Sequence, residues 1–256
     1  MDAIAGGGGI ITLPAYYVVG LPPHMAMGTN KFSSTFGTAI SSVKFLTSKN
    51  VHFKAAAISI PCALIGSACG SRLALYLSDE TLRYILLVAL PLLAIFLLRG
   101  NIRFSVSRKT DTKRLFLLKG ESQRKDGERK DLPTRKLLII VGIISFTIGT
   151  YDGFFGPGTG TFLIIAFNLI AGMDILTASG NAKIVNFASN FAALVIFLLS
   201  GNIVFVLGLP AAACSLAGSW LGASVALKSG AKVIKPMFIF VFVLLLIKIT
   251  IDMIGW

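Results

Sequence analysis

The sequence is poor in charged residues, and above all in acidic ones. Charged side chains make up 14% of the 256 residues, and 11 of these residues are Asp or Glu. A soluble domain of average composition has about 25% charged residues. With 55% hydrophobic residues, the chain has more apolar side chains than a soluble core of its size can bury. We therefore predict an integral membrane protein.

Motifs for metal binding and enzyme chemistry are also missing. The three cysteines, Cys62, Cys69 and Cys214, lie in apolar segments, and no two of them form a CxxC pair. This excludes a disulfide framework or a zinc site as the basis of the fold. The sequence has no HExxH, GxSxG or GxxxxGK[ST] motif and no cluster of carboxylates. We predict no catalytic residues, no metal and no cofactor. The start MDAIAGGGG has no basic region, so no cleavable signal peptide is expected.

The basic residues outnumber the acidic ones, which gives a net charge of +13. They collect in loops, and the polar stretch 99–136 alone contains 13 Lys or Arg against 5 Asp or Glu. The positive-inside rule predicts such a bias for cytoplasmic loops. The charge therefore indicates a lipid bilayer as partner, and not nucleic acid, with 99–136 as a basic cytoplasmic linker.

One stretch of the chain occurs twice. Adding 152 to a residue number in the first copy gives its counterpart in the second, without a gap. The matched pairs include Gly6/Gly158, Gly28/Gly180, Lys31/Lys183, Asn50/Asn202, Gly66/Gly218 and Gly70/Gly222. Such regular self-similarity indicates an internal duplication. We predict a first membrane repeat at 1–98 and a second at 137–256.

The apolar segments are divided unequally between the repeats. The first repeat has them at 4–19, 24–47, 55–76 and 81–98, and the second at 137–151, 159–172, 175–199, 204–227 and 234–254. The counterpart of 137–151 would precede Met1, so the first repeat is expected to lack its first helix. Either the chain is shortened or the protein lacks that helix. An odd number of segments per repeat predicts that the two repeats have opposite orientations.

Charges in the turns predict the same inversion independently. The first repeat has lysines where the second has none, at Lys44, Lys49 and Lys54 against Ile196, Gly201 and Val206. The next turn reverses the bias, with Lys228, Lys232 and Lys235 against Asp79 and Glu80, which offset Arg72 and Arg83. We predict an all-α multi-pass membrane protein of two inverted repeats with a cytoplasmic amino terminus, an architecture common among secondary transporters.

Polar residues lie inside both copies of the duplicated stretch. The short, glycine-broken segments 4–19 and 159–172 each form a predicted hairpin with the following polar segment, either as full spans or as re-entrant pieces lining a cavity. Lys31 and Lys183 are the sharpest feature, since a charge in a spanning helix costs at least a few kcal/mol. The two lysines either hold a substrate or snorkel to the interface. Their repeat pairing favours the first interpretation.

Each lysine follows GTN or GNA, which we place near a helix start. Helix-start N–H groups suit an anion, and glycine lets a ligand come close. The predicted small-anion site comprises Gly28, Thr29, Asn30, Lys31, Ser33, Ser34, Gly180, Asn181, Lys183, Asn186 and Asn190, with Thr38 as a further donor. For the neutral side chains, helix–helix hydrogen bonding is the alternative. Asp152 either couples transport to protons or caps the following short helix, and the cap is favoured.

The same residues carry a family resemblance. TYDGFFGPGTGTFL at 150–163, GNAKIVNFASN at 180–190 and GTNKFSS at 28–34 resemble the TauE/SafE sulfite exporter family, and most closely its YfcA-like branch. The resemblance implies a multi-pass protein of the bacterial inner membrane that exports sulfite or an organosulfonate by alternating access. The residues alone predict a small anion. An anion channel and a transporter of another small organic anion are the alternatives, and a homo-oligomer stays open.

Overall fold

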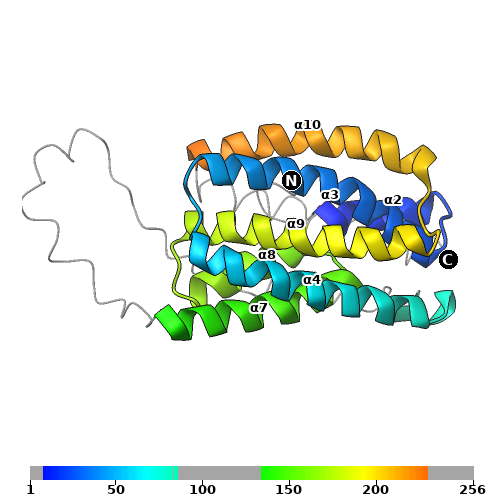
Figure 1. The fold of residues 1–256 in the computed structure, drawn as a ribbon. Coiled ribbons are helices and arrows are strands. Elements are labelled where there is room, and N and C mark those ends of the chain that lie inside the picture. The colour runs from blue at the N-terminus through cyan, green and yellow to red at the C-terminus, as the bar shows by residue number, and fades with distance from the viewer. Residues whose placement is uncertain (1–7, 83, 86–133, 230–256) are drawn as a thin grey trace, which may run out of the picture.

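The computed structural model describes residues 8–82, 84–85 and 134–229, and in that part of the chain all the regular structure is helical (Figure 1). The helices are α2 (Gly8–Val18), α3 (Pro23–Thr47), α4 (Phe53–Tyr76), α7 (Thr134–Phe154), α8 (Thr159–Leu169), α9 (Ile175–Leu199) and α10 (Phe205–Ser229). The all-α prediction is confirmed. Most of the predicted segment 81–98, most of the linker and the segment 234–254 lie outside the described residues.

Four of these helices are long and apolar enough to cross a membrane, namely α4, α7, α9 and α10. Helix α3 is as long as α9, with 25 residues, but its polar side chains keep it out of this group. Helices α2 and α8 have 11 residues each. At 1.5 Å per residue they extend about 16 Å, roughly half of the hydrocarbon core. The prediction of two short segments at matching places is confirmed, and their re-entrant course stays a prediction.

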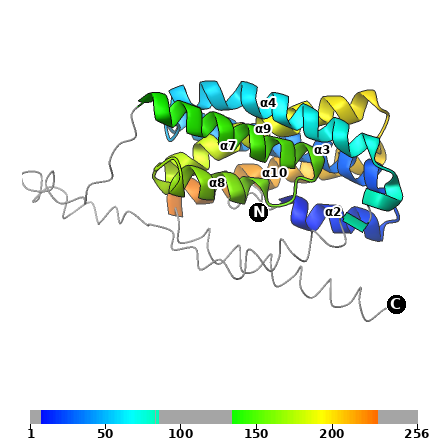
Figure 2. The ribbon, with the colours of Figure 1, turned by 90° about the horizontal axis from the view of Figure 1, so that it is seen from below.

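The long helices run side by side, with α9 at the centre (Figure 1). Helix α9 packs against α3, α4, α7 and α8, while α10 covers α3 and α4 covers α7. The short helices α2 and α8 lie toward opposite ends of this bundle (Figures 1 and 2). Small side chains on α9, among them Ala178, Ala182 and Ala188, let its neighbours approach closely and form part of the core with Leu163 and Phe167 of α8.

Helices α3 and α9 contact each other reciprocally through counterpart glycines. A Cβ atom on Gly28, early in α3, would overlap the carbonyl oxygen of Asn202, just after α9. A Cβ atom on Gly180, early in α9, would overlap the carbonyl oxygen of Asn50, just after α3. The beginning of each helix therefore lies at the end of the other. Two repeats of opposite orientation predict this arrangement, and the orientation in the membrane stays a prediction.

Helices α4 and α7 also meet through glycines. A Cβ atom on Gly66 would overlap the carbonyl oxygen of Phe146, and one on Gly70 that of Thr150. Gly66 and Gly70 are four residues apart, the spacing typical of close helix packing in membranes, and here they let α4 approach α7. The counterpart of Gly66 in α10 is Gly218, and a Cβ atom there would meet no described atom within 4 Å.

This difference predicts that the substitution Gly66→Ala destabilises the protein and that Gly218→Ala does not. Overpacking at Gly66 is expected to lower the free energy of unfolding by about 1–3 kcal/mol. The matched substitution on α10 removes the same backbone freedom without a clash. Thermal unfolding of the purified proteins in detergent measures both effects, and an equal loss in the two variants would contradict the α4–α7 packing.

Candidate functional site

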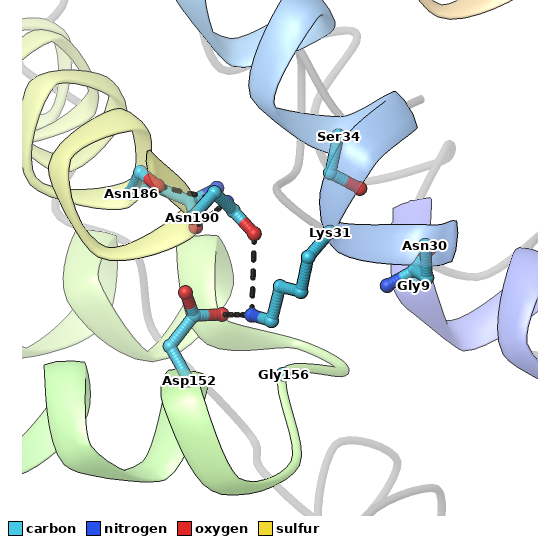
Figure 3. Close-up of a pocket in the computed structure, with 8 residues that line it drawn as sticks. All are labelled: Gly9, Asn30, Lys31, Ser34, Asp152, Gly156, Asn186 and Asn190. Atoms are coloured by element: carbon cyan, nitrogen blue, oxygen red, sulfur yellow. Dashed lines mark hydrogen bonds and ion pairs between the residues drawn. The ribbon is translucent and has the colours of Figure 1, made fainter. Parts of the chain in front are cut away.

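A small polar cavity lies where α2, α3, α7 and α9 come together (Figure 3). It is lined by Gly9, Asn30, Lys31, Ser34, Asp152, Gly156, Asn186 and Asn190. Its free space accommodates about one water-sized group. Both repeats therefore supply polar side chains to one cavity between the helices.

A buried ion pair forms one wall of the cavity. The Nζ atom of Lys31 lies 2.9 Å from Oδ1 of Asp152, and each side chain is 2% exposed. Lys31 also donates to Oδ1 of Asn190 at 3.2 Å. In Figure 3 the lysine reaches from α3 toward the carboxylate on α7 and the amide on α9. The alternative in which Lys31 snorkels to an interface is wrong, because its amine is enclosed by protein.

Asp152 is held from two further helices. Its Oδ1 atom accepts a hydrogen bond from Oγ1 of Thr159 at 2.7 Å, and Oδ2 accepts one from Oγ of Ser189 at 2.6 Å. The favoured interpretation of Asp152 as a helix cap is wrong. Helix α8 begins after Gly158, and no side chain caps it. Asp152 instead lies in the last turn of α7 and connects α3, α8 and α9.

The loop between α7 and α8 explains why the motif contains GPG. Gly156 and Gly158 have φ values of +91° and +78°, in the region that favours glycine. A Cβ atom on Gly156 would lie 3.0 Å from Nζ of Lys31, so glycine also leaves room for the amine. The hydroxyl of Tyr151 donates to the carbonyl of Pro157 at 2.6 Å and ties the loop to α7. The motif thus builds the cavity wall beside the ion pair.

The expected position of the lysines near helix starts is wrong. Helix α3 begins at Pro23 and α9 at Ile175, which places Lys31 and Lys183 in the third turn of their helices. The backbone N–H groups of GTN and GNA lie beyond the first four positions, so they bond within the helix and do not point at a ligand. Side chains, and not backbone groups, line the cavity.

The structure brings part of the predicted site together. Asn30, Lys31, Ser34, Asn186 and Asn190 line the cavity with Asp152. The residues outside its lining are Gly28, Thr29, Ser33, Gly180, Asn181 and Lys183. Gly28 and Gly180 serve the contact between α3 and α9.

Several predicted donors bond to backbone groups instead. Ser33 donates to the carbonyl of Asn30, Thr38 to that of Ser34 and Asn181 to that of Thr177. Thr29 accepts from the N–H of Val204. Ser33, Thr38 and Asn181 thus bond within their own helices, and not between helices as the alternative predicted. The bond of Thr29 joins α3 to the start of α10.

The cavity is asymmetric with respect to the repeats. Ser34 and Asn186 are counterparts and both line it, but Lys31 lines it and Lys183 does not. Lys183 is fully buried on α9. One lysine and one carboxylate, Lys31 and Asp152, are therefore the charged side chains in its lining.

Thr159 and Ser189 are partners of Asp152 that were not predicted from the sequence. Thr159 lies in the motif TYDGFFGPGTGTFL, and Ser189 lies in the motif GNAKIVNFASN. A carboxylate inside an apolar chain needs hydrogen-bond donors, since an unsatisfied buried charge is costly. The need for donors was a usable signal, but distance along the sequence does not identify them, since Thr150 and Tyr151 lie nearer to Asp152.

Comparison with known proteins identifies the family of the chain. The model of the family described as "Sulfite exporter TauE/SafE" matches residues 1–249. The chain belongs to the TauE/SafE family. This TauE/SafE protein is 32% identical over 255 residues to a probable membrane transporter protein of a Sinorhizobium species, covering 98% of this chain and 88% of the relative.

Two further relatives of the TauE/SafE chain have similar descriptions. A probable membrane transporter protein of Haemophilus influenzae is 32% identical over 257 residues, covering 100% of this chain and 91% of the relative. The probable membrane transporter protein YfcA of Escherichia coli is 29% identical over 255 residues, covering 100% and 86%. No solved structure matches the chain. Together with the apolar helices, these relatives indicate a multi-pass membrane transporter, and not an enzyme.

Proposed function

We propose that this TauE/SafE protein is a secondary transporter that exports a small sulfur-containing anion, sulfite or an organosulfonate, across the bacterial inner membrane. The observation that carries the proposal is the enclosed amine of Lys31 at the wall of a polar cavity. An ionisable residue at such a depth in a membrane protein is usually functional. The family description supports a sulfur oxyanion as cargo.

In this proposal the anion binds Lys31 through charge and the cavity's polar side chains through hydrogen bonds. Asn30, Ser34 and Asn186 contribute amide and hydroxyl groups to the cavity lining. Asn190 accepts from Lys31 through Oδ1 and donates its amide to Asn186. Charge-assisted hydrogen bonds of this kind are about twice as strong as neutral ones. Lys183 is proposed to contact the anion in the state that opens to the other side, as alternating access of two inverted repeats requires. The amino terminus and the 99–136 linker face the cytoplasm.

Counterflow in proteoliposomes tests the proposed function. Vesicles loaded with unlabelled sulfite or taurine are expected to accumulate external labelled anion transiently, with a rate that saturates at high concentration. Protein-free vesicles of the same lipid are the control. A flux that is linear in driving force, without saturation or counterflow, would replace the transporter by an anion channel, and no anion flux at all would remove the proposed function.

A further inference from the structure

We propose that Asp152 is a built-in competitor for the transported anion and takes up a proton when the anion binds. In the structure the Asp152 carboxylate occupies the position on Lys31 that an anion requires. The inference rests on the proposed function and adds its coupling: one proton moves with each monovalent anion.

The charges in the cavity require this exchange. Lys31 and Asp152 form a neutral pair that is removed from solvent. An anion that takes the place of Asp152 on Lys31 would leave a second, unpaired negative charge in the same enclosed space. Burying an unpaired charge is costly, and such a group becomes neutral instead. Neutrality is restored when the carboxylate takes up a proton from the solvent. Lys31 and the anion then form the new ion pair.

The partners of Asp152 suit both of its protonation states. Ser189 and Thr159 contact it through hydroxyls, which can donate to a carboxylate or accept from a carboxylic acid. Each hydroxyl already has a second acceptor for its own hydrogen. Oγ of Ser189 lies 3.1 Å from the carbonyl of Asn186, and Oγ1 of Thr159 lies 2.6 Å from that of Gly156. A neutral Asp152 can therefore keep its position after Lys31 has turned to the anion.

Lys31 is the charged side chain that faces Asp152 within ion-pair distance among the described residues. Lys183 is buried on α9, and Arg72 of α4 is exposed. Tyr151, the preceding residue of α7, directs its hydroxyl to the carbonyl of Pro157. Helix α8 has no titratable side chain, and those of α2 are Tyr16 and Tyr17. The cavity lining thus contains one acid and one base, so one proton is expected to be taken up for each anion bound.

Proton uptake on anion binding tests the inference directly. The full-length protein in detergent, in weakly buffered solution with a pH indicator, is mixed with methanesulfonate, whose single charge does not change around neutral pH. We expect about one proton taken up per anion bound and, as a consequence of that uptake, an affinity that falls by about tenfold for each unit rise in pH. The Asp152→Asn variant is expected to bind methanesulfonate without proton uptake and with an affinity independent of pH.

A carboxylate outside the cavity provides the matched control. Asp174 caps α9 by accepting from the N–H groups of Leu176 and Thr177, and asparagine caps helices equally well. Asp174→Asn is expected to keep the proton uptake of the unmodified protein.

The outcomes separate this inference from the proposed function. Anion binding by the unmodified protein without proton uptake would overturn the role of Asp152 and leave the transporter intact. The same conclusion follows if Asp152→Asn still takes up a proton. Absence of binding for both methanesulfonate and sulfite would remove the proposed function, and this inference with it. If Asp152→Asn fails to fold, the proton count of the unmodified protein decides.

Discussion

Replacing Lys31 with methionine is expected to reduce anion transport by at least about 100-fold. Methionine keeps the length and the apolar stem of the side chain but removes the charge at the cavity wall. Removing one partner of a buried, hydrogen-bonded charge pair costs about 2–5 kcal/mol, and each 1.4 kcal/mol is a factor of about ten. Initial rates of labelled sulfite or taurine uptake into proteoliposomes, normalised to folded protein, measure the loss.

The variant needs a control for folding, because Lys31→Met leaves Asp152 without its cation. An uncompensated buried charge destabilises a protein by about 3–5 kcal/mol, whereas replacing both partners by apolar residues is often neutral. The double variant Lys31→Met/Asp152→Leu is therefore expected to recover thermal stability but not transport. Normal transport by the double variant would show that the pair is structural, and the site assignment would be wrong.

Lys44 provides a matched lysine on the same helix. Its Nζ atom lies 3.7 Å from the centre of the Trp220 ring and donates to the Trp220 carbonyl, away from the cavity. Lys44→Met removes a positive charge from α3 without touching the cavity lining. The transport rate of this variant is expected to stay within about twofold of that of the unmodified protein, because a more exposed charge away from the cavity contributes little to the site.

The helix ends show what local sequence can predict. The predicted segment 175–199 coincides with α9. Asp174 caps the first turn of this helix, and Gly201, at φ +71°, has a backbone conformation that does not continue it. The start of α7 was predicted too late. Thr134, Arg135 and Lys136 are polar and were included in the linker, yet they form the first turn of that helix. Hydropathy marks the apolar part of a helix and misses a polar first turn.

The candidate site was predictable in its residues but not in its pairing. Lys31 and Asp152 lie in different repeats. A single sequence does not show which residues of one repeat face which residues of the other. Charge balance was nevertheless informative. Of the 11 acidic residues, five lie in the linker, and the others besides Asp152 lie in turns or near the chain ends, at Asp2, Asp79, Glu80, Asp174 and Asp252. A buried lysine needs a partner, and Asp152, directly after the segment 137–151, was one candidate beside Glu80, Asp174 and Asp252.

For the same reason the predicted ligand-binding role of Gly28 and Gly180 was wrong. Gly28 and Gly180 were predicted to admit a ligand, since each precedes a lysine by three positions. The structure instead places the carbonyl groups of Asn202 and Asn50 there. Close approach of a ligand and close approach of another backbone segment both require a residue without a side chain. Local sequence does not distinguish between them.

The double variant Gly28→Ala/Gly180→Ala is expected to lose about 2–6 kcal/mol of unfolding free energy, as two separate clashes of about 1–3 kcal/mol that add. The obstructing atoms are backbone carbonyl oxygens of turns, which cannot move aside like a flexible side chain. Because a native protein is stable by only about 5–15 kcal/mol, little folded protein is expected at elevated temperature. Thermal unfolding in detergent measures the effect.

Gly142→Ala is the control for this substitution. A Cβ atom there would lie 3.4 Å from Ile58 and 3.6 Å from Cys62, at ordinary contact distance, so its stability is expected to stay the same or rise slightly with helix propensity. The two single variants carry the stronger argument. If the repeats contact each other reciprocally, Gly28→Ala and Gly180→Ala must destabilise the protein by similar amounts. A large loss in one and none in the other would mean that α3 and α9 do not share a reciprocal contact, and the inverted arrangement would lose its structural support.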